Sequence, residues 1–175
     1  MYNIFACNGI LFNHESPLRG ETFVTKKIIS ALCKISLSGT GNLYLGNLYS
    51  KRDWGHAKDY VLAMWKMLQR KNPKDYVIAS GRQYSVKYFV NLICSILKIK
   101  IYWKGKGINE KAYWNGKVII SIDKKYFRPT EVDSLLGDSS KARKELRWKP
   151  LYNIKSLAQD MVAEELKKIH VNKKK

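Results

Sequence analysis

The sequence predicts an α/β fold, and three observations lead to that prediction. A nearly continuous apolar run, Tyr2 to Phe12, passes into a polar loop punctuated by glycine and proline, residues 13–20, which opens into a helical pattern. In α/β proteins, loops that follow the carboxyl ends of strands carry functional groups at the edge of the sheet. Amphipathic helical patterns and short apolar segments then follow one another. Finally, 175 residues with 45% hydrophobic content can bury a core and argue against disorder.

The first element is a strand followed by a candidate anion-binding loop. Tyr2 to Phe12 is apolar at both alternating sets of positions, so we expect a strand buried on both faces of a parallel sheet. The loop after it offers the amide of Asn13, the imidazole of His14 and the guanidinium of Arg19. Next to the start of a helix, these groups predict anion binding. An ordinary loop with solvated polar side chains accounts for the same spacing equally well.

The next pattern, Thr22 to Leu37, is an amphipathic helix. Its apolar stripe consists of Val24, Ile28, Ala31, Leu32 and Ile35, and Lys26, Lys27 and Lys34 lie off the stripe. A short strand, Leu43 to Gly46, follows a turn rich in glycine.

A second polar motif, Gly46 to Tyr60, leads into another helix. Asp53 is the expected N-cap of this helix, which runs to about Arg70. Its predicted buried stripe comprises Ala57, Val61, Met64, Trp65 and Leu68. Tyr76 to Ala79 then forms a short buried strand.

The last part of the chain alternates helices and strands. Ser85 is the expected cap of a helix that ends near Lys98. Strands are predicted at Ile99 to Trp103 and Val118 to Ile122, and loops that contain glycine flank the second strand. The third polar motif, Asp123 to Asp133, precedes two final helices, Ser139 to Leu146 and Ile154 to Ile169.

Composition narrows the classes of function. The net charge of +19 suggests nucleic acid, but the lysines are scattered through every segment and no nucleic-acid-binding motif accompanies them, so nucleic acid is disfavoured. No apolar run reaches 18 residues and no signal-peptide pattern opens the chain, which favours a cytoplasmic protein without a membrane span. Cys7, Cys33 and Cys94 are expected to be reduced core thiols, and no metal site is expected.

Four motifs, taken together and in this order, resemble one family. They are Gly9 to Pro17, Lys51 to Tyr60, Phe127 to Asp133 and Trp148 to Pro150. The chain resembles the C-terminal part of the GDP-mannose 4,6-dehydratase family, which belongs to the extended short-chain dehydrogenase/reductases. The resemblance implies the last strands and helices of an NAD(P)-binding Rossmann-type sheet within residues 1–82, with insertions that carry substrate loops. Residues 83–175 would mainly form the small α/β domain that binds the nucleotide sugar.

The resemblance also implies an activity and a set of site residues. Members of the family are NADP-dependent lyases of nucleotide-sugar metabolism that convert GDP-mannose to GDP-4-keto-6-deoxymannose, and they are homo-oligomers. By the family's pattern, His14 and Arg19 would contact NADP. The residues that would face GDP-mannose are Asn13, Lys27, Arg52, Arg128 and Glu131, with the two arginines on the pyrophosphate.

The departures from the family pattern concern catalysis. The glycine-rich phosphate loop, the Thr-x-Glu pair and the Tyr-x-x-x-Lys motif have no counterpart here, so no catalytic residue is assigned and the chain is expected to be inactive alone. Tyr102 with Lys106, and Tyr113 with Lys117, share the spacing, but glycines interrupt both and their surroundings predict strand and loop. A separate chain could supply the Rossmann half. The alternative is a non-catalytic basic binding module or the remnant of a decaying gene.

Overall fold

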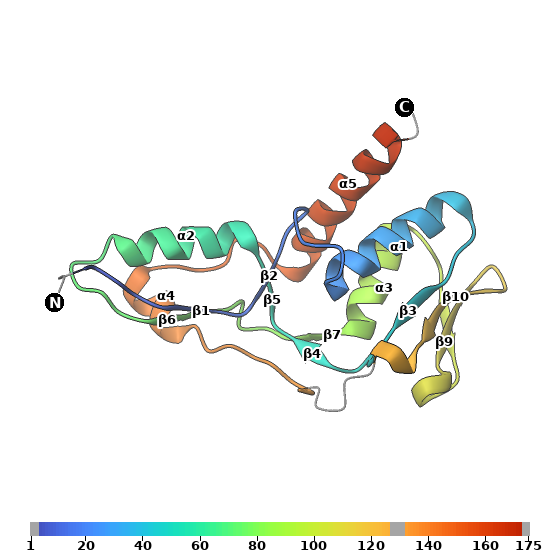
Figure 1. Cartoon of the computed structure of the whole chain (residues 1–175), viewed down its shortest axis with the longest axis horizontal. Coiled ribbons are helices and arrows are strands. Elements are labelled where there is room, and N and C mark those ends of the chain that lie inside the picture. The colour runs from blue at the N-terminus through green and yellow to red at the C-terminus, as the bar shows by residue number, and fades with distance from the viewer. Residues whose placement is uncertain (1–3, 127–131, 173–175) are drawn as a thin grey trace.

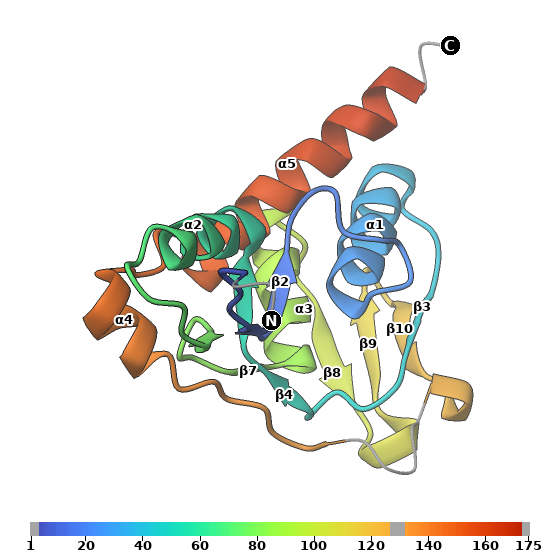
Figure 2. The ribbon, with the colours of Figure 1, turned by 60° about the vertical axis from the view of Figure 1, so that its left-hand side comes forward.

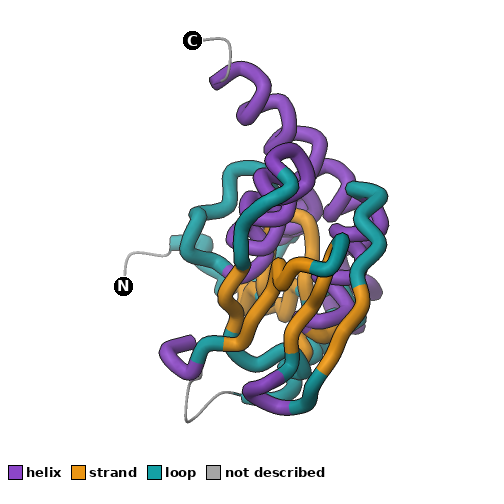
Figure 3. Tube along the Cα trace, turned by 90° about the vertical axis from the view of Figure 1, so that its right-hand side faces the viewer, coloured by secondary structure: helices purple, strands orange, loops and turns teal. Residues whose placement is uncertain are grey.

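The computed structural model describes residues 4–126 and 132–172 and confirms the α/β class. The largest sheet has four strands in the order β3 (Leu43–Leu45), β10 (Lys117–Ile122), β9 (Lys111–Trp114) and β8 (Tyr102–Lys104). β3 runs parallel to β10, whereas β9 is antiparallel to both of its neighbours. Figure 3 shows strands of this sheet side by side. The predicted strand at Ile99 to Trp103 is therefore shifted to Tyr102–Lys104.

β9 and β10 form a hairpin where the sequence analysis expected a loop. Asn115 and Gly116 make its two-residue turn, with φ of 48° and 76°. Such a turn needs positive φ at both residues, which asparagine and glycine tolerate best. Tyr102 and Tyr113 lie opposite each other on β8 and β9, and their ring centroids are 5.3 Å apart. Both tyrosines lie on strands, so neither shares a helix with the lysine four positions later, and this agrees with the sequence analysis.

Three helices pack beside this sheet and form the larger of two hydrophobic cores (Figures 1 and 2). They are α1 (Val24–Ser38), α3 (Val86–Ile96) and α5 (Ile154–Asn172). The core includes Ile28, Leu32, Phe89, Ile93, Ile119, Ile120 and Met161. All three helices were predicted, and the Ser85 cap is confirmed because its Oγ accepts the N–H of Tyr88 at 3.1 Å. Lys26 is buried, although it was expected off the apolar stripe of α1.

The second core lies around a pair of parallel strands, β1 (Gly9–Leu11) and β6 (Tyr76–Ile78). α2 (Ala57–Leu68) and α4 (Ser140–Leu146) pack there. The buried members are Tyr60, Ala63, Met67, Tyr76, Ile78, Ala142, Leu146 and Trp148. Trp148 fixes the end of α4 against α2, because its indole N–H donates to the carbonyl of Asp59 at 2.9 Å.

Two short strand pairs connect the cores (Figure 1). β2 (Asn13–Glu15) runs parallel to β5 (Trp54–His56), and β4 (Lys51–Arg52) runs antiparallel to β7 (Tyr84–Ser85). Two 3-10 turns, Gly107–Asn109 and Lys124–Tyr126, complete the described elements. Both cores draw on segments from each side of residue 82, since α1 belongs to the larger core and α4 to the second. The division into domains at residue 82 stays a prediction.

The first strand is shorter and more exposed than predicted. Regular strand is limited to β1, and the side chains of Ile4, Phe5 and Ile10 are exposed. Within the described part of the chain, β1 pairs with β6 alone. Gly9 and Leu11 face α2, whereas Ile10 points to the opposite side of the strand pair. The prediction of burial on both faces is therefore wrong for this structure, because α2 covers one face only.

The helix that follows the second polar motif also differs from its prediction. His56, not Asp53, is its N-cap. The predicted buried stripe is wrong: Val61, Met64, Trp65 and Leu68 are exposed, and Tyr60, Ala63 and Met67 are buried instead. α2 is apolar on two faces, so periodicity alone could not say which face meets the core.

The cysteines are free, as predicted, but they do not all lie in the core. Cys33 and Cys94 are buried, and Cys7 is half-buried at the edge of the second core. Burial raises the pKa of both core thiols to about 12. None of the helices in residues 4–126 and 132–172 has the length and apolar character needed to span a membrane.

Candidate functional site

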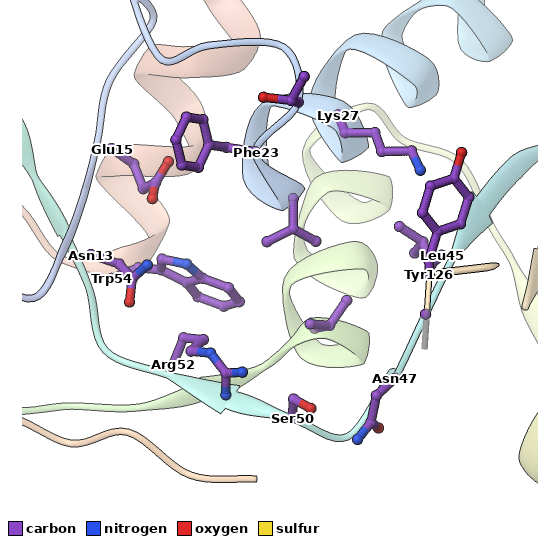
Figure 4. Close-up of a pocket in the computed structure, with 14 residues that line it drawn as sticks. Asn13, Glu15, Phe23, Lys27, Leu45, Asn47, Ser50, Arg52, Trp54 and Tyr126 are labelled. Atoms are coloured by element: carbon purple, nitrogen blue, oxygen red, sulfur yellow. The ribbon is translucent and has the colours of Figure 1, made fainter. Parts of the chain in front are cut away.

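A cavity of about 350 Å³ opens between the start of α1 and the segment that runs from β3 to β5, with Tyr126 on its far side (Figure 4). Its volume lies in the range of small-molecule sites. Polar side chains from four segments line it: Asn13, Lys27, Asn47, Ser50 and Arg52. The aromatic rings of Phe23, Trp54 and Tyr126 supply much of the apolar wall. Cationic, amide and aromatic groups thus converge on one space.

β2 sends its side chains to opposite sides. Asn13 and Glu15 line the cavity, whereas His14 points the other way and its ring lies 5.2 Å from that of Tyr60. This follows from the two-residue period of a strand. The Nδ1 atom of His14 lies 3.0 Å from the carbonyl oxygen of Phe12. A carbonyl can only accept, so Nδ1 carries the proton and Nε2 is left for another partner.

Glu15 anchors the wall of the cavity next to α1. Its buried carboxylate accepts the hydroxyl of Thr25 at 2.5 Å and pairs with Nε of Arg19 at 3.2 Å. Burial raises the pKa of Glu15, and the Thr25 hydrogen bond and the Arg19 charge only partly oppose that effect. The guanidinium of Arg19 also stacks 3.5 Å above the ring of Phe23. Arg19 therefore lies behind the wall that Phe23 forms and does not line the cavity.

Lys27 and Tyr126 meet across the opening of the cavity. The Nζ atom of Lys27, in the first turns of α1, lies 3.5 Å from the centroid of the Tyr126 ring. Gly46 makes the approach of this tyrosine possible, since a Cβ at Gly46 would lie 2.3 Å from the Tyr126 carbonyl oxygen. A cation held against an aromatic face keeps its charge at the mouth of the cavity.

Within the second polar motif, the side chains of neighbouring residues contact different parts of the molecule. Arg52 lines the cavity, and its Nη1 donates to the carbonyl oxygens of Lys51 and Val132 at 2.8 and 2.6 Å. Asp53 is fully buried and accepts the backbone N–H groups of Ser80, Gly81 and Gly137. Trp54 forms cavity wall and packs on Phe89 of the larger core. The motif thus holds a cation at the cavity while fixing two loops behind it, around residues 80 and 137.

His56 joins this motif to α5. Its Nδ1 accepts the N–H of Lys58 at 3.1 Å, so Nε2 carries the proton and donates to Asp160 at 3.0 Å. The imidazole also stacks on Tyr152, with ring centroids 3.9 Å apart. The cap of α2 is therefore also a contact between the two cores.

The structure brings together part of the predicted site. Asn13, Lys27 and Arg52 line one cavity, as the prediction of a common ligand requires, and His14 and Arg19 lie outside it. Arg128 and Glu131 lie outside the described residues, although Val132, at the described end of their motif, contacts Arg52. Among residues 4–126 and 132–172, no three His, Cys, Asp or Glu side chains gather in a way that could hold a metal ion.

Sequence reasoning assigned only Asn13, Lys27 and Arg52 among the lining residues. The polar and aromatic residues that it missed include Asn47, Ser50, Trp54 and Tyr126. These four residues lie within motifs that were singled out, but no spacing rule showed that their side chains face a common space. The buried Oγ of Ser50 has no hydrogen-bond partner among the residues described, so it offers an additional polar group to whatever fills the cavity.

The sequence matches known proteins along nearly its whole length. The sequence model of the family described as GDP-mannose 4,6 dehydratase matches residues 1–161. The GDP-mannose 4,6 dehydratase of Drosophila melanogaster is 53% identical over 173 residues, which are 98% of this chain and 44% of that protein. The Caenorhabditis elegans GDP-mannose 4,6 dehydratase 2 is 51% identical over 94% of this chain and 44% of its own length. The chain thus spans about half the length of the curated relatives it matches.

Solved structures show the same fold at low sequence identity. RMD from Pseudomonas aeruginosa, solved with NADPH, superposes with a TM-score of 0.74 at 16% identity and covers 92% of this chain and 48% of its own. The dTDP-glucose 4,6-dehydratase of Bacillus anthracis, solved with NAD, gives a TM-score of 0.71 at 18% identity and covers 94% and 45%. These likenesses confirm a Rossmann-type α/β fold of which this chain forms a part. Together with the four motifs and their close relatives, they lead to one conclusion: the chain belongs to the GDP-mannose 4,6-dehydratase family.

Proposed function

We propose that this chain is the GDP-mannose-binding, C-terminal portion of a GDP-mannose 4,6-dehydratase, which converts GDP-mannose to GDP-4-keto-6-deoxymannose. The observation that carries the proposal is the convergence of Asn13, Lys27 and Arg52, from three separate segments, on one cavity. The family pattern assigns all three to GDP-mannose. Arg52 lies 25 positions after Lys27 and 39 positions after Asn13 in the sequence, so the three side chains meet only because the fold brings them together.

The chemistry of the cavity suits a nucleotide diphosphate sugar. Arg52 can meet two pyrophosphate oxygens with charge-assisted hydrogen bonds, and Lys27 adds a second cation at the mouth. The aromatic wall of Phe23, Trp54 and Tyr126 offers faces for a base or a sugar ring. We further propose that Arg128 and Glu131 act on the same ligand.

We propose that His14 and Arg19 contact NADP on the side of β2 that faces away from the cavity. His14 and Arg19 point away from the cavity, so a second ligand could contact them without competing for it. An imidazole with Nε2 available and a guanidinium suit the polar parts of a dinucleotide. When bound, the nicotinamide would supply the hydride acceptor. This chain's contribution is to place His14 and the sugar-binding Asn13 on opposite sides of one strand.

The free cysteines support a reducing location, and we propose the cytoplasm.

The test is binding of GDP-mannose to the purified chain, measured by titration calorimetry beside UDP-glucose. Trp54 in the cavity wall gives a second readout, since its fluorescence should change on binding and Trp54→Phe should lose that change. We expect saturable 1:1 binding of GDP-mannose that moderate salt affects little. A basic nucleic-acid module would instead bind duplex DNA and lose about 10³- to 10⁵-fold in affinity between 50 and 200 mM salt. That second result, with no GDP-mannose binding, would contradict the proposal.

A further inference from the structure

Ser50 carries a buried polar group for which the folded chain provides no partner. The residue lies just before β4, lines the cavity and is 2% exposed. Among the residues described, its Oγ makes no hydrogen bond. A buried hydroxyl without a partner destabilises a protein, and nearly all such groups are bonded. The cavity is the place from which a partner can reach Ser50.

The backbone around Ser50 is fixed by the start of α3. The N–H of Val86 donates to the carbonyl of Ser50 at 3.2 Å, and the N–H of Lys87 donates to the carbonyl of Leu48 at 2.8 Å. These hydrogen bonds hold the main chain, so Ser50 adjusts by rotation about its Cα–Cβ bond. That torsion has three staggered positions and can turn the hydroxyl toward a ligand without movement of the backbone.

The side chain before Ser50 is held on the opposite side of the segment. Tyr49 is 58% exposed, and its hydroxyl donates to the buried carboxylate of Glu110 at 2.9 Å. The same carboxylate pairs with the Nζ atom of Lys87. Successive side chains of an extended segment point to opposite sides, so the contact of Tyr49 with Glu110 keeps Ser50 at the cavity.

The order of the lining residues indicates which end of a ligand reaches Ser50. Asn47, Ser50 and Arg52 follow one another along the wall toward β2 and β5 (Figure 4). Asn13 lines the cavity at that end, and His14, proposed for NADP, lies on the other side of β2. A sugar that passes a hydride to a nicotinamide must lie near it, at the β2 end. The nucleoside then lies beyond Arg52, beside Ser50.

We propose that the Ser50 hydroxyl binds the ribose-phosphate portion of the nucleotide, next to the pyrophosphate that Arg52 contacts. The inference rests on the proposed function, because it takes GDP-mannose as the ligand. Side chains two positions apart in an extended segment lie about 7 Å from each other, so one nucleotide can meet both. A hydroxyl can donate to a phosphate oxygen, and it can donate to or accept from a ribose hydroxyl. The ligand thus supplies the hydrogen bond that the chain itself does not.

Ser50→Ala should have opposite effects on stability and on binding. It removes an unpartnered buried hydroxyl, so the urea midpoint of the chain without ligand should rise. It also removes one contact to the nucleotide, so titration calorimetry should show an affinity for GDP-mannose that is about 5- to 10-fold lower, as expected for one hydrogen bond. GDP, which lacks the mannose, should lose affinity by the same factor.

The matched control is Ser139→Ala, which removes a buried hydroxyl that has partners. Ser139 is 3% exposed, and its Oγ donates to the carbonyl of Ala79 and accepts Nε–H of Arg143, both at 3.0 Å. Ser139 does not line the cavity. This variant should lower the urea midpoint and leave both affinities unchanged, which is the reverse of the pattern expected for Ser50→Ala.

Several results would overturn the inference for a chain that binds GDP-mannose. They are an unchanged affinity in Ser50→Ala, an equal loss in Ser139→Ala, and a loss for GDP-mannose that GDP does not share. A urea midpoint of Ser50→Ala that fails to rise would show that the hydroxyl already has a partner, and it would overturn the inference as well. Circular dichroism checks that each variant is folded.

The same titrations separate the inference from the proposed function. A parent chain that fails to bind GDP-mannose contradicts the proposed function, and the inference falls with it. A parent chain that binds GDP-mannose no better than Ser50→Ala contradicts the inference alone.

Discussion

Arg52 and Asp53 are neighbours in sequence but belong to different parts of the molecule. The strand around them turns one side chain toward the cavity and the other toward the loops behind it. The carboxylate of Asp53 satisfies three backbone N–H groups that would otherwise be buried without partners. The positions of two loops therefore depend on the residue next to the proposed pyrophosphate contact.

Arg52→Ala is expected to weaken GDP-mannose binding by about 1.5 to 3 kcal/mol, the scale of a hydrogen bond to a charged group. Titration calorimetry measures the difference. Lys144→Ala and Lys168→Ala serve as controls, since both lysines are exposed and neither lines the cavity. If either control weakens binding as much as Arg52→Ala, diffuse electrostatics explains the affinity and the cavity is not the site.

Lys26 and Glu165 form a buried ion pair between α1 and α5, 139 residues apart in sequence. The Nζ of Lys26 donates to Glu165 at 2.7 Å and to the carbonyl of Pro17 at 3.1 Å. The pair thereby ties the loop after β2 to the last helix. Lys26→Met should lower the free energy of unfolding by about 3 to 5 kcal/mol, because it leaves a carboxylate buried and unpaired.

Urea unfolding tests this expectation. Adding Glu165→Leu to Lys26→Met should restore most of the loss, since an apolar pair often replaces a buried ion pair at little cost. Glu164→Gln breaks an exposed pair with Lys167 on the same helix and should change stability by less than about 1 kcal/mol. Equal losses from Lys26→Met and Glu164→Gln would show that burial of the first pair has no energetic consequence.

The pair also gives stability a dependence on pH. Burial alone would raise the pKa of Glu165, but the hydrogen bonds from Lys26 and Ser30 outweigh it and hold that pKa below its usual 4.5. A carboxyl whose pKa is lowered by folding stabilises the protein above the unfolded pKa, and this contribution disappears as pH falls through the folded value. The stability difference between the parent chain and Lys26→Met should accordingly shrink below about pH 4.

At the scale of elements, the β1–β6 pair is held at its start by a side chain. Asp75, just before β6, accepts the backbone N–H of Asn8 at 2.6 Å and the Asn8 amide at 3.2 Å. The backbone hydrogen bond, followed by the side-chain one, lowers the pKa of Asp75 below 3.8. The contribution of Asp75 is thus present at neutral pH and is lost as pH falls below about 4.

Hydrogen exchange should show that β1 is the least protected part of the sheet structure. In the chain alone, residues 9–12 should exchange faster than residues 86–97 of α3 and its end, which lie in the larger core. After correction for intrinsic rates, acidification below pH 4 should reduce protection of residues 9–12 further. Asp75→Asn should abolish this pH effect, and Asp138→Asn, which alters an exposed carboxyl next to α4, should not. Equal protection of the two segments would mean that the chain covers its own first strand.

At the scale of the whole molecule, these 175 residues form the cavity, and we expect them not to catalyse the reaction on their own. Incubated alone with NADP and GDP-mannose, the chain should form no 4-keto sugar. Its two Tyr-x-x-x-Lys pairs, Tyr102 with Lys106 and Tyr113 with Lys117, begin on strands and do not share a helix face, so we assign no general base. Loss of a general base alone typically costs about 10² to 10⁴ in rate. The assay monitors 4-keto sugar, with the full-length Drosophila melanogaster relative as the positive control. Turnover comparable to that control would mean that residues of this chain supply a base that we have not identified.

The sequence by itself determined the helices and the family. Local sequence patterns predicted helices at 22–37, 85–98, 139–146 and 154–169, and the structure has them at 24–38, 86–96, 140–146 and 154–172. Ser85 also predicted a cap. Helix periodicity and capping can be predicted because they depend on residues within a few positions of one another. The four motifs identified the family for the same reason, as each is a continuous stretch. Asn13, Lys27 and Arg52 came from that resemblance, and the fold places them on one cavity.

Only the tertiary structure decided what each face of an element contacts. α2 has two apolar faces, and the one buried is the one that meets β1, β6 and α4, all distant in sequence. Lys26 is buried because Glu165 reaches it from α5, and Asp53 binds loops around residues 80 and 137 instead of capping the next helix. Local sequence fixes which conformations are favourable, but burial and pairing depend on partners that folding brings together, and these no local pattern specifies.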